Sequence, residues 1–451
     1  MLLRNLHLRH LKRLSALELD FKNPDGSPRK WTALIGRNGT AKTTILQAIA
    51  LAAAGSFRAD KLVDDIRESL PDKRVPGAEA WIEAEFTFGP VGLRAAGAHP
   101  TLAADLRPRL RDPGHRLLLN SVLNVRAKAS LEGAAGYTDE RGEALDSNGD
   151  PLVEAREENQ ALWFVAGYGV DRFLPQVKLV SEPPPRPSID RLRPIFQRWD
   201  LLGPNWESVL GEGLWQKYAA LLKKVLFRTE ELVPGIVDLE LRGRRSQHPN
   251  DLMTSHRFVQ RVGDNELKLP ATWLSHGYQS VLAWVSDLVG QITLEAGAVL
   301  PPEKMEGLVL IDEVDLYLHP KWQVGLVQAL RDTFPEMQFV VTTHSPILLT
   351  AFRREEVVVL DFNEHGDVVQ SDTPKDPRLM TATELYEWFF GIDRLYPSEL
   401  GQKLDAYNTI AANPFRTEDE DAIAAKLGED LRREGITPGV PLSPRRRATG
   451  T

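Results

Sequence analysis

The chain has 451 residues, and 42% of them are hydrophobic, so it can bury a sizeable core and form two or three domains. It contains no cysteine, which excludes disulfide bonds and thiolate metal sites. Its 63 acidic and 55 basic residues give a net charge of −8, which argues against a broad basic surface for nucleic acid but not against a local basic groove.

A glycine-rich loop stands between two apolar segments near the start of the chain. Residues 31–35 predict a buried strand, and residues 45–54 predict a helix with its apolar side chains on one face. A strand, a glycine loop and a helix in this order are the context of a phosphate-binding loop. The loop comprises Gly36, Arg37, Asn38, Gly39, Thr40, Ala41, Lys42, Thr43 and Thr44.

Each residue type in this loop suits the binding of phosphate. Gly36 and Gly39 let the backbone turn its N–H groups toward phosphate oxygens, and the helix N-terminus adds partial positive charge. Lys42 would reach the β- and γ-phosphates, and the hydroxyl of Thr43 would bind Mg²⁺. Ala41 stands where a third glycine is common, but it adds only a methyl group, so we expect the site to survive. The alternative is a glycine turn that happens to precede a lysine.

Strand-like segments follow the phosphate loop. Residues 80–88, 117–125 and 161–166 are assigned to a small antiparallel sheet of the first lobe. Proline-rich residues 183–187 interrupt the chain, and helical spacing then continues to about Phe227. The apolar residues that share this helical face are interpreted as core: Trp206, Val209, Leu210, Leu214, Tyr218, Leu221, Leu222 and Val225.

This middle part of the chain is expected to form a compact helical lid. No heptad pattern continues for many turns, which disfavours a long coiled-coil arm. Basic residues at 241–245, together with Lys223 and Lys224, form either a DNA-contacting patch or a solvated loop.

A short polar segment precedes the next predicted helix. Ser275, Gly277 and Gln279 alternate just before a helix that carries apolar residues at Leu282 and Val285. Alone, this segment is compatible with an ordinary helix cap. Its place, roughly 35 residues before an acidic strand end, makes it more specific.

That acidic strand end is a second candidate part of the site. Residues 308–311 predict a strand buried on both faces, and Asp312 and Glu313 follow it. Asp312 would hold Mg²⁺ through water, and Glu313 would polarise the attacking water as a general base. A surface acidic pair is the alternative. The helix that begins near Pro320 carries an apolar stripe, which is assigned to the core.

His344 follows a further predicted strand at residues 338–341. A histidine at a strand end can be a simple turn residue. Because it comes after the acidic strand in sequence order, we interpret it as a switch that senses the γ-phosphate.

These four segments, in this order, resemble the motifs of an ATP-binding-cassette (ABC) ATPase. The resemblance implies an α/β P-loop NTPase head that closes as a homodimer around ATP and Mg²⁺. It implies that Ser275, Gly277 and Gln279 form the signature, in which the serine hydroxyl and glycine N–H contact the γ-phosphate held by the other subunit. It also implies that Asp315 is the D-loop aspartate that meets the partner.

Two further segments narrow the resemblance. Residues 1–21 look like the opening hairpin of the RecF, SMC and OLD-like ABC ATPases. Residues 311–320 are similar to the soluble ATPases of bacterial anti-phage defence systems of the Septu, PARIS or retron-associated type. By position, Gln176 is the nearest candidate for the family's glutamine after a first-lobe strand, and Lys12 and Arg13 for the adenine side.

The resemblance divides the chain into four parts. Residues 1–180 are expected to form ABC lobe I, 181–265 the mostly helical lid, 266–370 lobe II, and 371–451 a C-terminal helical extension with a flexible tail. Helices are predicted at residues 382–390 and 418–433, and the acidic start of the second is interpreted as a solvated helix end.

Three functions compete as explanations of these motifs. The preferred one is a cytoplasmic ATPase that acts as sensor or regulator in a multi-protein anti-phage complex and controls a separate effector, a nuclease or toxin. The alternative is a RecF-like DNA-binding ATPase in repair or recombination. A transporter cassette is disfavoured by the opening hairpin and the lid, so no membrane partner is expected. DNA binding and an oligomer larger than the dimer are both compatible with the sequence.

Overall fold

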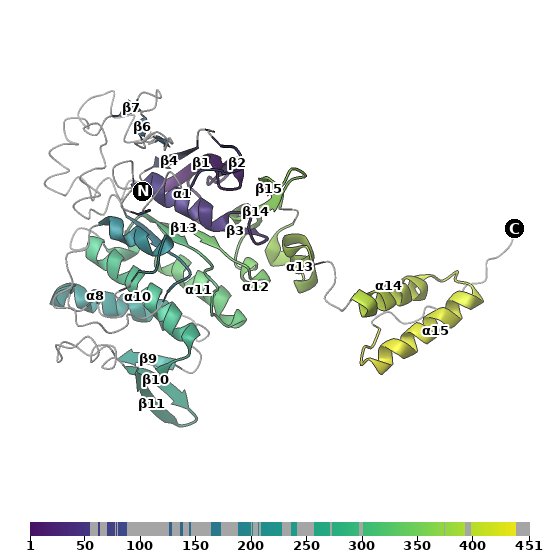
Figure 1. Cartoon of the computed structure of the whole chain (residues 1–451). Helices are drawn as coiled ribbons and strands as arrows, with labels where there is room; N and C mark the ends of the chain where they lie inside the picture. The colour runs from purple at the N-terminus through teal and green to yellow at the C-terminus, as the bar shows by residue number, and fades with distance from the viewer. Residues whose placement is uncertain are drawn as a thin grey trace. The chain divides into compact units, whose positions relative to one another are not determined.

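The computed structural model divides the chain into two compact units, Met1–Met380 and Thr381–Thr451, which are considered separately (Figure 1). The residues that it describes are 1–54, 62–63, 70–76, 78, 80–87, 126–128, 136–138, 144–145, 164–172, 188–199, 201, 206, 209–227, 236–240, 257–270, 273–296, 301–373, 375–392 and 398–438.

A six-stranded sheet forms the centre of the first unit. Its strands, in spatial order, are β15 (Val368–Ser371), β14 (Val357–Phe362), β3 (Trp31–Gly36), β13 (Met337–Thr342), β12 (Gly307–Ile311) and β8 (Val165–Tyr168). All neighbours pair in parallel except β14 and β15. Every residue of β3, β12 and β13 is buried, as expected for strands covered on both faces. The expected α/β P-loop architecture is therefore confirmed.

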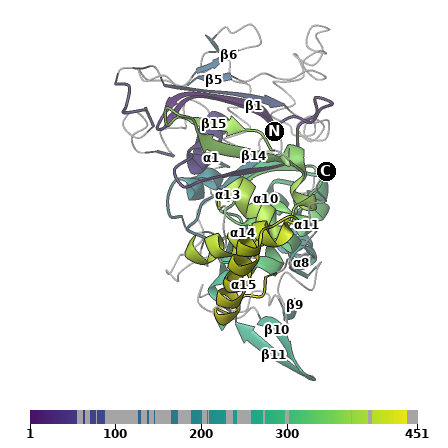
Figure 2. The ribbon, with the colours of Figure 1, turned by 90° about the vertical axis from the view of Figure 1, so that its right-hand side faces the viewer.

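A smaller antiparallel sheet covers one side of this centre. It comprises β2 (Leu14–Asp20), β1 (Leu2–Leu11) and β4 (Trp81–Thr87), which confirms the predicted opening hairpin and the strand near residues 80–88. Helix α1 (Lys42–Ala54) lies between the two sheets and shares one hydrophobic core with both (Figures 1 and 2). The buried side chain of Gln338 joins the sheets, since it exchanges hydrogen bonds with the backbone N and O of Leu3 at 2.6 and 2.9 Å.

Helices cover the other face of the six-stranded sheet. They are α8 (Glu212–Phe227), α10 (His276–Ala296) and α11 (Pro320–Thr333), and α8 packs against both of the others (Figure 1). Trp284 of α10 contacts Tyr168 of β8, with ring centroids 5.9 Å apart. The expected core positions Tyr218, Leu221 and Val225 are buried in α8, and Trp206, which lies before that helix begins, is buried as expected.

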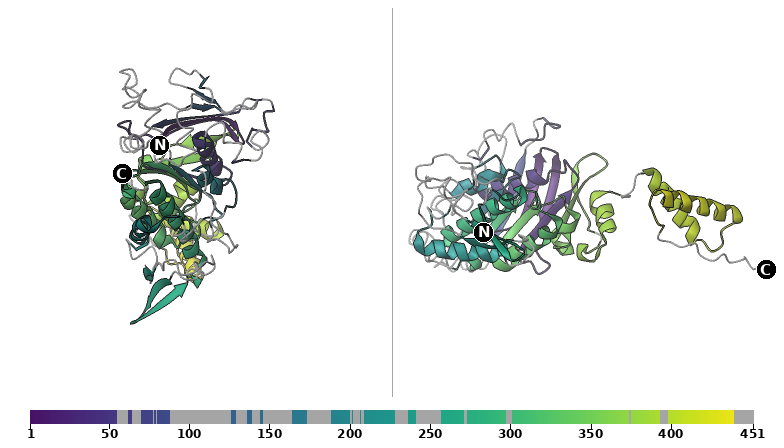
Figure 3. Two further views of the ribbon diagram at one scale, coloured as in Figure 1. Left: turned by 90° about the vertical axis from the view of Figure 1, so that its left-hand side faces the viewer. Right: turned by 90° about the horizontal axis from the view of Figure 1, so that it is seen from below.

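The middle of the chain also holds strands. Strands β9 (Ile236–Glu240), β10 (Arg257–Val262) and β11 (Asn265–Pro270) form an antiparallel sheet at the far end of the unit from β1 (Figures 2 and 3). A second small sheet is made by β5 (Arg126–Lys128), β6 (Gly136–Thr138) and β7 (Ala144–Leu145). The part expected as a helical lid therefore combines helix α8 and the 3₁₀ helix η2 (Ser188–Ile195) with strands.

One strand assignment was wrong. The segment at residues 161–166 was expected in the antiparallel sheet, but β8 lies at the edge of the six-stranded sheet, parallel to β12. All four residues of β8 are buried, a pattern of strands covered on both faces rather than of a half-exposed sheet. The segment at 117–125 lies outside the described residues.

The second unit is helical. It comprises α13 (Ala382–Phe390), α14 (Ser398–Ala412) and α15 (Glu418–Arg433); the first and third match the predicted ranges, and α14 was not anticipated. Thr381 and Thr417 close capping boxes at the starts of α13 and α15. Helices α14 and α15 share a small core of Tyr407, Ala411, Ala424 and Leu431.

Within the described part of the chain, no helix is long and apolar enough to cross a membrane. The first unit also contains short helices, which are α12 (Pro346–Leu349), η5 (Pro302–Lys304), η6 (Arg354–Glu356) and η7 (Pro377–Leu379).

Candidate nucleotide site

The phosphate loop follows β3 and leads into α1. Gly36 has a φ of 153°, and a Cβ atom there would lie 2.2 Å from the carbonyl oxygen of Leu360 in β14. Only glycine fits so close to a neighbouring backbone. The hydroxyl of Thr40 donates to the carbonyl oxygen of Arg37 at 2.8 Å and closes the turn. The tip formed by Arg37, Asn38 and Gly39 is exposed, whereas Thr40 and Thr44 are buried.

Ala41 adopts a left-handed backbone, with a φ of 62°. This conformation costs an alanine roughly 1–2 kcal/mol relative to glycine. The structure thus gives a reason why glycine is common at this position. It also indicates that the loop keeps the required backbone shape despite the extra methyl group.

Lys42 lies at the base of the loop. Its ammonium group donates to the carbonyl oxygens of Gly36 and Arg37, at 2.8 and 3.1 Å. Burial lowers the pKa of Lys42, while the nearby carboxylates of Asp312 and Glu313 act in the opposite direction. The positive charge of Lys42 is therefore held beside the two predicted acidic groups.

A chain of hydrogen bonds joins the phosphate loop to the ends of β12 and β13. The Thr43 hydroxyl donates to Asp312 Oδ2 at 2.7 Å, and the Thr342 hydroxyl donates to Asp312 Oδ1 at 2.6 Å. The backbone N–H of Glu313 donates to Thr342 Oγ1 at 2.7 Å. Both oxygens of the Asp312 carboxylate are thus oriented by hydroxyl groups on neighbouring elements. Thr342 was not among the predicted site residues, although it begins the Thr-Thr-His segment.

The donor set fits Mg²⁺. Thr43 and Asp312 present a hydroxyl and a carboxylate oxygen 2.7 Å apart, and Mg²⁺ prefers such hard oxygen ligands. Among the described residues, no three His, Cys, Asp or Glu side chains cluster to hold a metal by themselves. Mg²⁺ in nucleotide sites is commonly bound by one or two protein oxygens and completed by substrate phosphates and water.

Glu313 has an unusual backbone. Its φ is 47°, the left-handed region, and it lies two residues after the end of the buried strand β12. The N–H is held by Thr342, and the carbonyl oxygen accepts from Arg172 Nη2 at 2.5 Å. Such a conformation, fixed on both sides, turns the chain sharply and sets the direction of the side chain.

Arg172 is a residue that the sequence analysis missed. It follows β8, and only 1% of its surface is exposed. Burial lowers the pKa of Arg172 to about 10, against the opposing effect of Asp312, Asp315 and Glu313, so the side chain stays charged at neutral pH. A single arginine in a glycine-containing segment gave no signal that could distinguish it from a surface residue.

His344 lies just after β13 and is partly buried. Burial and the positive charge of Lys42 lower the pKa of His344, so its imidazole is neutral at pH 7. The charges of Glu313, Asp315 and Asp312 act in the other direction, which places the ring within the field of the same cluster. The next residue, Ser345, donates to Gln323 Oε1 of α11 at 2.5 Å and thereby anchors this loop.

The signature segment contacts the loop after β12. Ser275 is exposed immediately before α10, and the Gln279 side chain donates to the carbonyl oxygen of Leu274 at 2.7 Å. Gly277 is buried, and a Cβ atom there would lie 2.3 Å from the carbonyl oxygen of Tyr317. The predicted signature and the predicted D-loop, which contains Asp315, are therefore in direct backbone contact within one chain.

The predicted adenine-side residues lie beside the phosphate loop. The Arg13 guanidinium stacks 5.2 Å from the centroid of the Phe362 ring, and its Nη1 lies 3.4 Å from the Cβ position of Gly39. Lys12 approaches Gln47 at 3.5 Å. Phe362, at the end of β14, was not predicted. Gln176 and residues 241–245 lie outside the described residues, and Lys223 pairs with Asp238 at 2.8 Å.

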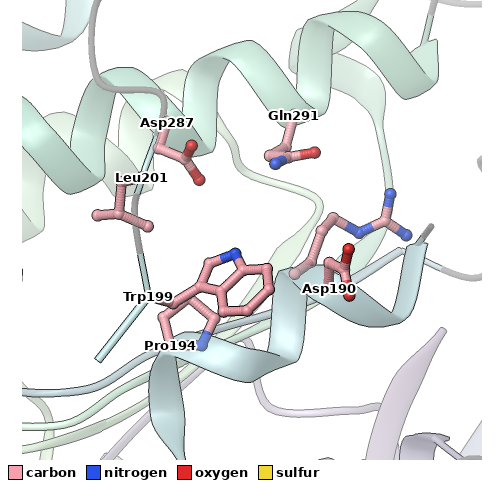
Figure 4. A pocket seen from close by; sticks show the side chains of 7 residues that line it. Asp190, Pro194, Trp199, Leu201, Asp287 and Gln291 are labelled. Atoms are coloured by element: carbon pink, nitrogen blue, oxygen red, sulfur yellow. The ribbon is translucent and has the colours of Figure 1, made fainter. Parts of the chain in front are cut away.

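A small pocket with polar and apolar lining lies between η2 and α10 (Figure 4). Its lining residues are Asp190, Arg191, Pro194, Trp199, Leu201, Asp287 and Gln291. The Tyr168 hydroxyl donates to Asp287 Oδ2 at 3.0 Å, and the carbonyl oxygen of Tyr168 accepts from the Asp312 N–H at 2.8 Å. The helix that begins at the signature is thus linked through β8 to the acidic end of β12.

A family model described as "AAA domain, putative AbiEii toxin, Type IV TA system" matches residues 197–350. This range contains the signature segment, the acidic strand and His344. Two curated proteins match almost the whole chain, each at 23% identity. The "Septu protein PtuA" of Bacillus mycoides matches over 95% of this chain and 50% of its own length. The "Retron Ec83 probable ATPase" of Escherichia coli matches over 94% of this chain and 83% of its own length.

A third relative matches a shorter part more closely. The "Retron Vc95 probable ATPase" of Vibrio cholerae is 42% identical over 88 residues, 20% of this chain and 17% of that protein. Among solved structures, an SMC head domain from Thermotoga maritima is 15% identical with a TM-score of 0.42, covering 83% of this chain and 100% of that chain. An SMC head bound to the C-winged helix domain of ScpA is 14% identical with a TM-score of 0.47, covering 83% and 98%. The chain spans half the length of the first of the curated relatives.

Proposed function

We propose that the chain binds ATP with Mg²⁺ and hydrolyses it to ADP and phosphate, which its similarity to Septu PtuA and to a retron probable ATPase supports. The observation that carries this proposal is the hydrogen-bond chain Thr43–Asp312–Thr342, which ends on the Glu313 N–H. These hydrogen bonds connect the phosphate loop to a carboxylate that could bind a metal ion and to the backbone of the candidate base.

Each residue then has a role that its position supports. The Lys42 ammonium and the N–H groups of the loop bind the β- and γ-phosphates. Thr43 and Asp312 would hold Mg²⁺, which neutralises charge on the phosphates when it is bound. Glu313 accepts the proton of the attacking water, and neutral His344 makes a hydrogen bond to the γ-phosphate.

Two copies would complete each site. Ser275 is exposed immediately before the 21-residue helix α10, so its hydroxyl is open to a second molecule, and the N-terminus of that helix carries partial positive charge. These are groups that bind phosphate oxygens. In the proposed dimer, the signature of one copy contacts the γ-phosphate held by the phosphate loop of the other.

The purpose of the cycle is proposed to be regulation in anti-phage defence. The names of the relatives, Septu and retron ATPases, support this setting. ATP would close two heads and hydrolysis would release them, and a separate effector would respond to that change. In this proposal the effector contacts the helical unit near Phe415 and Ile423, which are 62% and 50% exposed.

Two substitutions test the proposed chemistry. Glu313→Gln keeps the shape of the side chain but removes the base, so it should retain ATP binding and lose turnover by at least about a hundredfold. Lys42→Ala removes the main phosphate ligand and should lose tight nucleotide binding. Steady-state ATP hydrolysis and binding of a fluorescent ATP analogue measure the two effects. Hydrolysis at the parental rate by Glu313→Gln would refute the assignment of the base.

A further inference from the structure

Arg172 carries donors that the described structure leaves unmet. Its Nη2 donates to the Glu313 carbonyl oxygen at 2.5 Å, whereas Nε and Nη1 are buried without a hydrogen-bond partner among the described residues. A guanidinium has five N–H donors, and buried donors are nearly always paired. A side chain 1% exposed that keeps unmet donors beside a candidate base calls for a functional explanation.

An unmet acceptor of opposite charge lies on the adjoining loop. Asp315 Oδ1 is buried and has no hydrogen-bond partner in the described part of the chain, and the charge of Asp315 acts on Arg172. Arg172 and Asp315 therefore carry opposite charges, and each has a buried polar atom without a hydrogen-bond partner among the described residues. A modest movement of the loop would let a guanidinium nitrogen of Arg172 donate to the Asp315 carboxylate.

The loop from Glu313 to Leu318 is held together by hydrogen bonds of its own backbone. Hydrogen bonds inside it link the Leu316 N–H to the Glu313 carbonyl and the Leu318 N–H to the Asp315 carbonyl, both at 2.9 Å. Its backbone is left-handed at Glu313 and at Tyr317, with φ of 47° and 64°. At its far end, the Tyr317 carbonyl lies against Gly277 of the signature. Arg172 thus holds one end of a loop whose other end contacts the signature.

We propose that Arg172 is a positioning residue that sets the direction of the Glu313 carboxylate and links it to Asp315. The inference rests on the proposed ATPase function. Arg172 fixes the Glu313 main chain through its carbonyl oxygen, and its remaining donors bind Asp315 when the loop shifts as two copies close. Glu313 is then aligned for proton transfer only when the signature and the loop have reached their positions in the closed dimer. Hydrolysis is therefore restricted to that dimer.

Variants of Arg172 test this inference. Arg172→Met keeps much of the volume and removes the charge and the donors, and Arg172→Lys keeps the charge but loses the planar fork. We expect Arg172→Met to bind the fluorescent ATP analogue within about twofold of the parent and to lose at least about tenfold in single-turnover hydrolysis. Arg172→Lys should fall between the two. If Arg172→Met does not fold, as judged by its thermal unfolding midpoint, Arg172→Lys carries the test.

A matched control separates positioning from packing. Arg191 is also a buried arginine, 6% exposed, but its ion pair is with Glu295 of α10, so Arg191→Lys should hydrolyse ATP at the parental rate. An equal loss in Arg191→Lys and Arg172→Lys would overturn the inference, because both losses would then be structural.

Coupling to the base provides a second readout. Because Arg172 acts through Glu313, adding Arg172→Met to Glu313→Gln should not slow single-turnover hydrolysis further. The inference would be overturned if the rate losses of the two single variants multiply in the double variant. It would also be overturned if Arg172→Met hydrolyses ATP at the parental rate, or if weaker ATP binding accounts for its whole loss of rate. The proposed function is judged separately, from the parent and Glu313→Gln alone.

Discussion

At the scale of single residues, the backbone at the nucleotide site is under local strain. Ala41 and Glu313 both have positive φ, at 62° and 47°, without being glycine. Each costs free energy that the surrounding structure must offset. Both residues border groups that would contact phosphate or water, so the strain lies where the orientation of a side chain or N–H decides the chemistry.

Ala41 gives a prediction about that strain. Ala41→Gly should bind ATP within about threefold of the parent, because glycine adopts the left-handed conformation without penalty. Ala41→Val should lose at least about tenfold in ATP affinity, because a β-branched residue rarely adopts positive φ. Binding of a fluorescent ATP analogue measures both. Equal affinity of the valine variant would mean that the loop does not need this backbone shape.

Some residues of the site could be predicted from the sequence and others could not. Lys42, Thr43, Asp312 and Glu313 stand in short motifs next to buried strands, and the structure brings them together. Arg172, Thr342 and Phe362 were missed because their importance depends on which strand ends lie side by side. A lone arginine, threonine or phenylalanine carries no spacing signal until the strand order is known. The roles of all these residues in binding and catalysis stay predictions.

At the scale of elements, the core strands and most helices were predictable from apolar periodicity. Strands β3, β12 and β13 are mostly apolar segments, and α13 and α15 match their predicted ranges. The sheet that contains β8 was not predictable, because periodicity reports burial but not the pairing partner. Helix α14 was not predicted, although Leu404, Tyr407 and Ala411 recur at helical spacing and lie in or against its small core.

The contact between α10 and the D-loop gives a prediction at this scale. In Gly277→Ala, the new Cβ would lie 2.3 Å from the Tyr317 carbonyl oxygen, so the loop must shift. We expect a loss of about 1–3 kcal/mol in the free energy of unfolding and a slower ATP hydrolysis. Chemical denaturation and steady-state hydrolysis measure these effects.

Gly211 provides the control for this substitution. A Cβ atom at Gly211 meets no heavy atom within 4 Å, and its backbone does not require glycine. Gly211→Ala should therefore leave both hydrolysis and stability close to the parental values. If Gly277→Ala is as stable and active as Gly211→Ala, the close contact of signature and D-loop is not required.

At the scale of the whole molecule, the proposed role requires a second protein that reads the nucleotide state. Co-expression with its genomic neighbours, followed by size measurement with and without ATP, should reveal an effector whose association depends on nucleotide. The opposite outcome is a protein that associates with no neighbour but binds duplex DNA tightly with ATP and a steep salt dependence. That outcome would favour the RecF-like alternative.

The central claim is that each ATP site is completed by two copies of the chain. Lys42→Ala removes the phosphate ligand and Ser275→Arg blocks the signature, so each variant alone should be inactive. In an equal mixture, half of the dimers are mixed, and each mixed dimer keeps one intact site of two. Hydrolysis should therefore recover to about a quarter of the parental rate, if the two sites act independently. Parental activity of Ser275→Arg alone, at a concentration where it is monomeric, would contradict the claim.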